Sequence, residues 1–462
     1  MKLKYVFWGL AATVCAVPLK PRFDYSGLSF SKGSFHITMF NDLHMGDRGD
    51  QDGSPKKKDV WSDDATIDVM NKILSFESTT DLAVLNGDLL SCEWVGGTAV
   101  YDLLNKVMSP FIHRKTPFAA TYGNHDWSPT CNTRWMSEHM WRTANDRKNG
   151  RQLTFTMNSL DGDPNVVGSS NYFIPLYSTS SGKRELRMIL WFFDSKGGFL
   201  YTGDGNNQQS VEDWVNQKVI NWFKQTRDQI ENSHGGKTIP SLVFVHIPIP
   251  ITDKFARSGK RSRITEPGIQ NERLSVQGDA PVNADQAVPF MQALADTKGL
   301  LGVFSGHDHA TDWCMKWAKT PEPIPADWPT SIIGNGLNIC FGRHTGYGGY
   351  GEYMRGGRHI IIHEEALEGD NAIETWMRLE NGEISGRVTL NSTYGTDEYP
   401  PVALKYSTYS QADSSVASEG FHEHSSITTN DKDVDDYDPS EDEPDEVRDH
   451  SPSEAEYNET NN

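Results

Sequence analysis

The sequence predicts an α/β fold, and two features of the chain lead to that prediction. Short apolar runs such as 82–85, 186–193 and 241–245 are typical of strands that are buried on both faces. Between several of these runs lie longer segments in which apolar residues recur every three or four positions, the pattern of an amphipathic helix. Alternation of strand and helix along a chain indicates a parallel sheet with helices packed on it.

The first half of the chain alternates strand and helix from residue 34 onward. Strands are predicted at 34–40, 82–85 and 117–120. A helix is predicted over 63–77, because its apolar residues fall on one face, and Ser62 is the expected N-cap. A second helix is predicted over 98–108. The polar segment 127–170 is expected to form an inserted cap or long loop over the site described below.

The second half continues with the same kinds of element. Strands are predicted at 171–176, 186–193, 241–245 and 300–304, and helices at 211–230 and 284–295. The charged segment 252–282 is expected to be a loop near the mouth of the site. Three later segments are predicted to be strands of a second sheet, at 331–340, 359–363 and 372–379.

The net charge of -20 is concentrated at the end of the chain. The segment 411–462 has 17 acidic residues against Lys432 and Arg448, a net charge of -15, so the rest of the chain carries about -5. The chain has no basic stripe of the kind that would indicate a nucleic-acid partner. Low hydrophobicity and dense acid predict disorder over 407–462. This segment is interpreted as a solvated tail that aids solubility, with a docking segment for a basic partner as the alternative.

The first 17 residues have the features of a secretory signal peptide. Lys2 and Lys4 precede an apolar run at 5–16, and small residues follow at the expected cleavage site. The run is short for a membrane anchor, which is the alternative interpretation. We therefore expect a linker at 18–33, a location outside the cell or in the secretory pathway or vacuole, and no stable insertion in a membrane.

Cysteines and glycosylation sequons suit the same route. Beyond the signal peptide, four cysteines can form two disulfides in three connectivities; they are Cys92, Cys131, Cys314 and Cys340. Cys92 is interpreted as structural because it lies in no CxxC or CxH pattern. Sequons at Asn391 and Asn458 predict a glycoprotein.

Polar residues follow five of the predicted strands at the point where each strand ends. Open parallel sheets bind ligands outside the carboxyl ends of their strands, so these side chains are expected to meet. They are Asp42 and His44, Asp88, Asn124 and His125, His246, and His307 and His309. Taken alone, any one of these groups could be an ordinary polar histidine or a turn. The whole set at successive strand ends indicates a site for Fe, Mn or Zn.

Seven oxygen and nitrogen donors exceed the needs of one tetrahedral ion and therefore predict two divalent or mixed-valence ions. The centrally placed Asp88 is expected to bridge them. One ion is assigned to Asp42, His44 and His309, and the other to Asn124, His246 and His307. His125 remains as a proton donor or a phosphate contact, with Asp126 as the residue that orients it.

The same blocks resemble those of the calcineurin-like metallophosphoesterases. They are Asp42-Leu43-His44, Gly87-Asp88, Gly123-Asn124-His125-Asp126, His246 and Gly306-His307-Asp308-His309. The resemblance covers about 35–365 and implies a β-sandwich of two mixed sheets flanked by helices, in a domain at 34–406. The stretch 342–350 is similar to the purple-acid-phosphatase-like subgroup. Purple enzymes bind ferric iron with a tyrosine shortly after the bridging aspartate, but this chain has none there, and His44 takes that place.

The resemblance implies direct hydrolysis of a phosphomonoester by a hydroxide that bridges the two metals, with His125 acting on the leaving group and Arg343 binding substrate. The expected partner is a small phosphate ester or a phosphoprotein, and the oligomeric state is left open. A phosphodiesterase or nucleotidase with the same site is the first alternative. The second is a non-catalytic extracellular protein that keeps its metals for structure.

Overall fold

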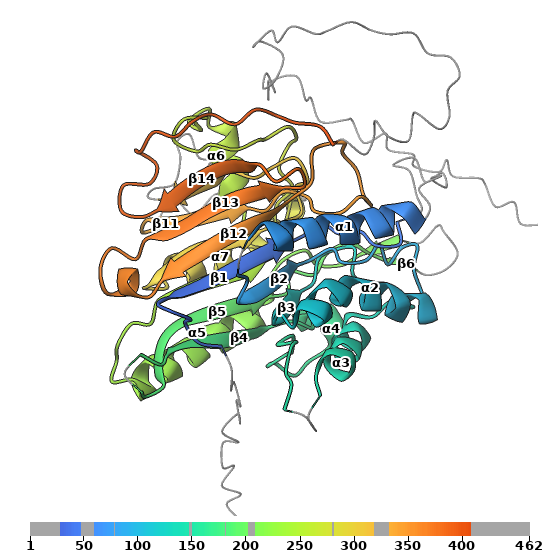
Figure 1. Ribbon diagram of the computed structural model, residues 1–462, viewed down its shortest axis with the longest axis horizontal. Coiled ribbons are helices and arrows are strands. Elements are labelled where there is room, and N and C mark those ends of the chain that lie inside the picture. Colours follow the sequence, from blue (N-terminus) through green and yellow to red (C-terminus); the bar gives the residue numbers. More distant parts are fainter. Residues whose placement is uncertain are drawn as a thin grey trace, which may run out of the picture.

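Two six-stranded β-sheets form the centre of the molecule (Figure 1). The computed structural model describes residues 28–47, 60–77, 79–146, 150–180, 182–201, 208–279, 281–317 and 332–407. The first sheet contains β1 (Ser34–Phe40), β2 (Leu82–Asn86), β3 (Phe118–Thr121), β12 (Gly356–His363), β13 (Ile373–Leu379) and β14 (Ile384–Leu390). The second contains β4 (Tyr172–Ser178), β5 (Glu185–Phe193), β8 (Ser241–Val245), β9 (Leu300–Ser305), β10 (Cys314–Trp317) and β11 (Leu337–Phe341). A small hairpin joins β6 (Phe199–Tyr201) to β7 (Gln208–Ser210).

Both sheets are mixed, as the family resemblance implied. The first has the order β14-β13-β12-β1-β2-β3, with β1, β2 and β3 parallel and β12 antiparallel to β1. The second has the order β10-β11-β9-β8-β5-β4, with parallel pairs at its centre and antiparallel strands at both edges. Ile37, Val84 and Val243 belong to one continuous buried cluster that fills the space between the sheets. The predicted α/β sandwich is therefore confirmed.

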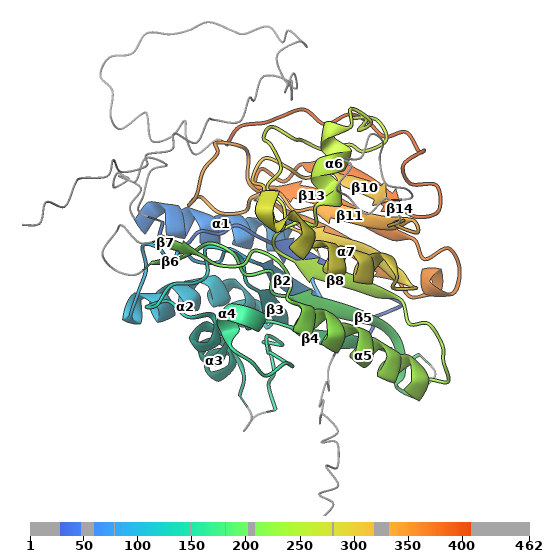
Figure 2. The same ribbon diagram turned by 180° about the vertical axis from the view of Figure 1, so that it is seen from behind.

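Helices cover the outer faces of both sheets. The helices are α1 (Val60–Phe76), α2 (Thr98–Arg114), α3 (Thr133–Ala144), α4 (Pro164–Val167), α5 (Gln217–Ser233), α6 (Ile251–Arg257) and α7 (Val288–Ala295), with 3₁₀ turns η1 (Pro281–Gln286) and η2 (Glu365–Glu368). Helices α1 and α2 lie on the first sheet (Figure 1), and α5 and α7 lie on the second, as the view from behind shows (Figure 2). Among the described residues, no helix combines the length and apolarity needed to cross a membrane.

The first two helices differ in detail from their predictions. Helix α1 begins at Val60, so Ser62 lies inside the helix and is not its N-cap. Helix α2 continues six residues past the predicted end at 108, through Pro110. Proline cannot donate to the carbonyl four residues earlier. That carbonyl, on Lys106, instead accepts a hydrogen bond from the Ser109 hydroxyl at 2.8 Å, which explains how the helix tolerates the proline.

The later strands correct the prediction of a separate second sheet. Of the three later segments, only β11 belongs to the second sheet. Strand β12 pairs with β1, and β13 pairs with β12, so both belong to the first sheet. Two strands of the central sheets, β10 and β14, were missed, since one is four residues long and the other contains Gly386, and the short strands β6 and β7 were missed as well. Sequence patterns of this kind identify a buried strand but not its neighbour, because pairing depends on contacts between distant parts of the chain.

Two segments outside the central sheets also differ from expectation. The end of the predicted linker 18–33 belongs to the core, because Leu28 and Phe30 are buried and the Phe30 amide donates to Tyr177 O at 2.9 Å. The described part of 127–170, expected as a cap over the site, packs along the edge of β3 and on α2. The predicted signal peptide 1–17 and the tail beyond Ser407 lie outside the described residues.

Candidate metal centre

The seven predicted ligands lie in the loops that follow β1, β2, β3, β8 and β9, which belong to two sheets rather than one. The sheets meet at this edge. The side-chain amide of Asn86 donates to Phe304 O at 3.2 Å, and the backbone amide of His307 donates to Asp42 Oδ1 at 3.1 Å. Two groups of side chains converge there, and within each group the donor atoms lie within 4.8 Å of one another. The first is Asp42, His44 and His309, and the second is Asp88, His246 and His307. The first group is the set assigned to one ion above.

Asp88 lies between the two groups. Its Oδ2 atom is 2.9 Å from His246 Nε2 in the second group and 3.7 Å from His44 Nε2 in the first. Its other oxygen accepts a hydrogen bond from the His125 amide at 2.8 Å, which fixes the orientation of the carboxylate. This position suits a carboxylate that bridges two cations.

Three of the imidazoles are held with the same nitrogen pointing inward. Nδ1 of His246 donates to Asn86 O at 2.8 Å, and Nδ1 of His309 donates to Tyr350 O at 3.0 Å. A carbonyl can only accept, so Nδ1 of each ring carries a proton and Nε2 is the nitrogen that faces the cluster. His44 Nδ1 contacts Ser91 Oγ at 3.1 Å, and its Nε2 lies 3.2 Å from His309 Nε2. The lone pair of His309 Nε2 therefore faces His44 Nε2, where either a proton on His44 or a cation between the two nitrogens can satisfy it.

Burial keeps three of the four candidate histidine ligands neutral, whereas for His246 burial is outweighed by the neighbouring Asp88, which raises the pKa to about 9. Burial lowers the pKa of His44 to about 4, with His125 adding to the effect, and it lowers the pKa of His307 to about 3, together with His246. The pKa of His309 is also well below its usual range, through burial and the neighbouring His44. Neutral imidazole is the form that binds metals.

The carboxylates of the cluster respond to their surroundings in opposite ways. Burial raises the pKa of Asp42 to about 7, against the effect of His246. Burial also acts to raise the pKa of Asp88, but the imidazoles of His246, His125 and His44 outweigh it and hold that pKa well below its usual range. Asp88 therefore stays ionised, as a bridging ligand must.

Four of the candidate ligands have strained backbones. The φ angles of Asp42, His44, Asp88 and His307 are 54°, 45°, 51° and 77°. This left-handed conformation costs a non-glycine residue roughly 1–2 kcal/mol. Gathering so many strained residues around one point indicates that the fold is stabilised elsewhere to hold these side chains in place.

Two glycines allow close approach of the backbone. A Cβ atom on Gly123 would lie 2.3 Å from Asp88 Oδ1, so no side chain fits there. Gly349, with φ of +70°, belongs to the glycine-rich stretch 342–351, and a Cβ atom on it would lie 2.7 Å from His309 Cε1. The glycine-rich stretch thus packs directly on the ligand histidines.

The residues present fit a pair of metal ions. The Oδ1 atom of Asn124 is buried and has no hydrogen-bond partner among the described residues. An orphaned buried carbonyl oxygen is costly unless a cation or a water satisfies it. Together with the inward Nε2 atoms and the central Asp88, it completes the donor set that the sequence predicted.

His125 lies beside the cluster and is paired with Glu93, a residue that sequence reasoning missed. The His125 Nδ1–H donates to Glu93 Oε1 at 2.8 Å, and the side chain of His125 is 38% exposed. Burial opposes its charge, but the carboxylates of Asp88 and Glu93 outweigh this and raise the pKa of His125 to about 10. Cations bound at Asp88 would offset part of that rise. His125 can therefore hold a proton where a substrate can reach it.

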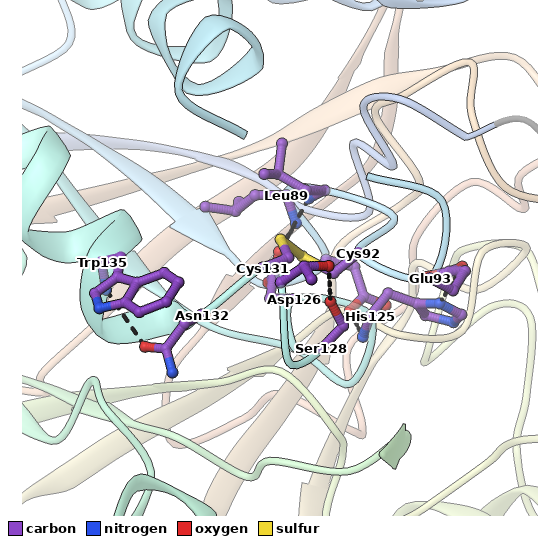
Figure 3. The surroundings of a disulfide bond; sticks show 12 residues. Leu89, Cys92, Glu93, His125, Asp126, Ser128, Cys131, Asn132 and Trp135 are labelled. Atoms are coloured by element: carbon purple, nitrogen blue, oxygen red, sulfur yellow. Dashed lines mark hydrogen bonds and ion pairs between the residues drawn. A yellow bond between two sulfur atoms is a disulfide. The ribbon is translucent and has the colours of Figure 1, made fainter. Parts of the chain in front are cut away.

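Asp126 does not orient His125, contrary to the prediction. Its Oδ1 atom accepts hydrogen bonds from the backbone amide of Leu89 at 2.8 Å (Figure 3) and from that of Leu90 at 2.9 Å. Its Oδ2 atom accepts from the Gly123 amide at 2.9 Å. All three bonds go to backbone. Asp126 thus ties the loop that carries Asp88 to the loop that carries Asn124, which is a positioning role.

A family model for calcineurin-like phosphoesterases matches residues 35–311, more than half of the chain. The chain belongs to the calcineurin-like phosphoesterase family. Curated relatives include "Probable inactive purple acid phosphatase 14" of Arabidopsis thaliana, 26% identical and covering 76% of this chain and 81% of the relative. "Phosphatase DCR2" of Saccharomyces cerevisiae is 27% identical and covers 75% of this chain and 54% of the relative. A solved dimetal phosphatase from Danio rerio matches with 10% identity and a TM-score of 0.41, covering 77% of this chain and 98% of that chain.

A disulfide in this calcineurin-like phosphoesterase joins the loops that carry Glu93 and His125 (Figure 3). Of the three possible connectivities, the structure has Cys92–Cys131 and Cys314–Cys340. The Cys92 amide also donates to His125 O at 2.9 Å. Cys92 is structural, as predicted, but its structural role is to place the next residue, Glu93, against His125.

Replacing Cys92 and Cys131 together with serine is expected to lower both stability and turnover. Loss of the link should cost about 2–4 kcal/mol of unfolding free energy and loosen the Glu93 loop. Denaturant unfolding and kcat would be measured on the same samples. The matched control is the Cys314→Ser, Cys340→Ser double variant, which should lose stability and keep kcat. Equal kcat in both double variants would contradict the positioning role of Cys92–Cys131.

The structure places Arg343 in a buried ion pair and not at an open substrate surface, contrary to the prediction. Its side chain is 1% exposed, and its Nη2 and Nε atoms lie 2.6 and 2.9 Å from Asp312 Oδ2. Its Nη1 donates to Met354 O at 3.3 Å. The loop is packed closely against the end of β1 and the segment after it, where Gly342 lies against Asn41 and Gly346 against Leu43, and the arginine neutralises a buried carboxylate.

The Arg343→Met substitution is expected to destabilise the fold by about 3–5 kcal/mol, because Asp312 would remain buried without its partner. Denaturant unfolding would measure the loss. The control is Arg387→Met, which removes an exposed ion pair with Glu374 and should cost less than about 1 kcal/mol. An Arg343 variant of normal stability with a raised KM would restore the substrate-binding interpretation.

Proposed function

We propose that this protein is a metal-dependent phosphoesterase that hydrolyses phosphomonoesters. The observation that carries the proposal is the pairing of a solvent-accessible His125 with Glu93 beside the converging ligands. Ligands alone are equally consistent with a structural metal site. A histidine held at Nδ1 by a carboxylate, next to those ligands and open to solvent, is the arrangement of a general acid or base.

The two ions would be held by the seven candidate ligands, with Asp88 shared. When bound, such ions polarise phosphate oxygens and lower the pKa of a coordinated water. The donor set suits Fe, Mn or Zn. In the segment after Asp88, the Oγ atom of Ser91 contacts His44 Nδ1 at 3.1 Å. Since Leu89, Leu90 and Ser91 offer no phenol, an obligate ferric ion is not part of the proposal.

His125 supplies the proton for the leaving group. Glu93 accepts from Nδ1, so Nε2 is the nitrogen left to face the substrate. The backbone N–H of His125 donates a hydrogen bond to Asp88 Oδ1, which keeps the ring close to the ligand cluster. His125 can thus protonate the alkoxide as the ester bond breaks, and Glu93 stabilises the imidazolium before that transfer.

The alternative of a non-catalytic protein is relevant because two relatives have names that include "probable inactive". A protein that kept its metals for structure alone would have no need of the His125–Glu93 pair. Hydrolysis is therefore favoured. A phosphodiesterase or nucleotidase is the remaining alternative, since it would use the same site.

The decisive experiment compares phenyl phosphate with bis-phenyl phosphate as substrates of the purified chain, with metal content measured by elemental analysis. Faster hydrolysis of the monoester with about two metals per chain is the expected result. Faster hydrolysis of the diester would favour the alternative enzyme. Two metals with no turnover of either ester would favour the non-catalytic protein.

We propose that the domain spans 28–407, because Leu28, Phe30 and Ser407 are buried, that residues 1–17 direct the chain into the secretory route, and that the segment after 407 is a solubility tail. Deleting 411–462 is then expected to leave kcat and KM for phenyl phosphate unchanged within about twofold, because surface charge acts on solubility rather than on fold. Steady-state kinetics would test this. A large loss of turnover would show that the tail takes part in the reaction.

A further inference from the structure

Tyr350, in the glycine-rich stretch 342–351, lies flat on a candidate ligand histidine. The rings of Tyr350 and His309 are 3.9 Å apart between centroids, with an angle of 8° between their planes. His309 is 2% exposed, whereas Tyr350 is 37% exposed. Because one face of the tyrosine ring lies against His309, its exposed area belongs to the other face and the edges. An aromatic surface is thus presented to solvent one side chain away from the candidate metal centre.

Hydrogen bonds hold this ring at both ends. The Tyr350 hydroxyl donates to Glu272 Oε2 at 2.6 Å, and the other oxygen of Glu272 accepts from the Ala310 amide. At the backbone, Tyr350 O accepts from His309 Nδ1 at 3.0 Å. Glu272 lies in 252–282, the segment that the sequence predicts near the site mouth. The ring is therefore anchored to the His309 loop on two sides.

The backbone leading to the ring is equally constrained. The Gly349 amide donates to Asp47 Oδ2 at 2.7 Å, and Gly349 is packed too closely on His309 and His44 for any side chain. A ring held in this way loses little freedom when a ligand packs on it, which favours binding. Rigidity of this kind is what a binding surface needs and what a solvated loop residue lacks.

The chemistry of the ring limits what it can recognise. A phenol held by a carboxylate carries no positive charge, so it cannot hold the phosphate group itself. It offers a flat π-surface, which binds planar aromatic groups by stacking. Its contact with a ligand histidine keeps that surface close to the ester bond. The bound group is therefore expected to be joined to the phosphate by a short link.

We propose that Tyr350 is a stacking platform for the leaving group and that the preferred substrates are aromatic phosphomonoesters of the aryl or benzyl type. This inference rests on the proposed phosphomonoesterase activity and goes beyond it by naming the substrate class. A stacked aromatic pair contributes enough to change kcat/KM by about tenfold.

The test compares benzyl phosphate with cyclohexylmethyl phosphate, which have similar size and similar alkoxide leaving groups and differ in aromaticity. The wild-type ratio of kcat/KM is expected to favour benzyl phosphate by about tenfold. Tyr350→Leu should bring that ratio close to one, and Tyr350→Phe should keep most of it. The control is Tyr353→Leu, three residues away, whose ring stacks on Tyr406 with centroids 6.0 Å apart and which should leave the ratio unchanged.

A binding measurement separates failure of the platform from failure of the proposed activity. Benzylphosphonate and cyclohexylmethylphosphonate cannot be hydrolysed, and calorimetry would compare their binding to the metal-loaded protein. Tighter binding of the aromatic compound that is lost in Tyr350→Leu supports the platform even if no ester is hydrolysed. Equal binding of both compounds to the wild type, or a ratio of kcat/KM that Tyr350→Leu does not alter, overturns it.

Discussion

Replacing Asp88 with asparagine is expected to lower kcat for phenyl phosphate on the order of 10³-fold and to reduce the bound metal to one ion per chain or fewer. Asp88 lies between the two ligand groups, 2.9 Å from His246 and 3.7 Å from His44. Asparagine keeps the shape and can still accept from the His125 amide, but it loses the charge that offsets two cations. Elemental analysis and steady-state kinetics on one preparation would measure both effects.

The matched control is Asp81→Asn, at the opposite end of the same strand. Asp81 precedes β2, whereas Asp88 follows it, and Asp81 accepts from the His36 amide at 2.9 Å. Metal content and kcat should stay at wild-type values in this variant. If Asp88→Asn kept two metals per chain and near-normal kcat, Asp88 would not be the bridging ligand and the assignment of the whole centre would need revision.

The His125→Ala substitution is expected to lower kcat by about 10²–10⁴-fold while both metals stay bound. His125 is paired with Glu93 and is not a member of either convergent ligand group. The loss should be larger for an alkyl phosphate than for 4-nitrophenyl phosphate, because a poor leaving group depends more on protonation. Glu93→Gln should follow the same substrate dependence with a smaller loss, about 10–100-fold.

A second exposed histidine provides the control for this experiment. His139 lies on α3, where its Nε2 contacts Asn105 Oδ1 at 2.8 Å, and His139→Ala should leave kcat unchanged for both substrates. An equal loss for the alkyl and aryl esters in His125→Ala would argue against proton donation. Loss of metal from that variant would instead make His125 part of the ligand shell.

The two substitutions separate the parts of the centre by different measurements. Metal content responds to Asp88, whereas the dependence of kcat on the leaving group responds to His125 and Glu93. A merely structural defect would lower metal content and both rates together. The pattern across both variants therefore tests the proposed chemistry more sharply than either rate alone.

The sequence by itself determined the fold class and the identity of the candidate ligands. Buried strands appear as local apolar runs, and the ligands follow those runs directly, as Asp42 follows β1 and His246 follows β8. Both signals are contained within a few consecutive residues. For that reason they could be recognised without knowing which strands pair.

Only the tertiary structure decided the partners of these residues. Glu93 is five residues from Asp88 and 32 from His125, and the fold and the Cys92–Cys131 link bring it to the imidazole. Arg343 was predicted to contact substrate, but the structure pairs it with Asp312, which lies just before β10, in a buried ion pair. Asp126 looked like a partner for its neighbour, but its oxygens are taken by backbone amides of another loop. Hydrogen bonds and ion pairs depend on atoms that meet across the fold, so a linear pattern names the residue and three-dimensional contacts decide what it does.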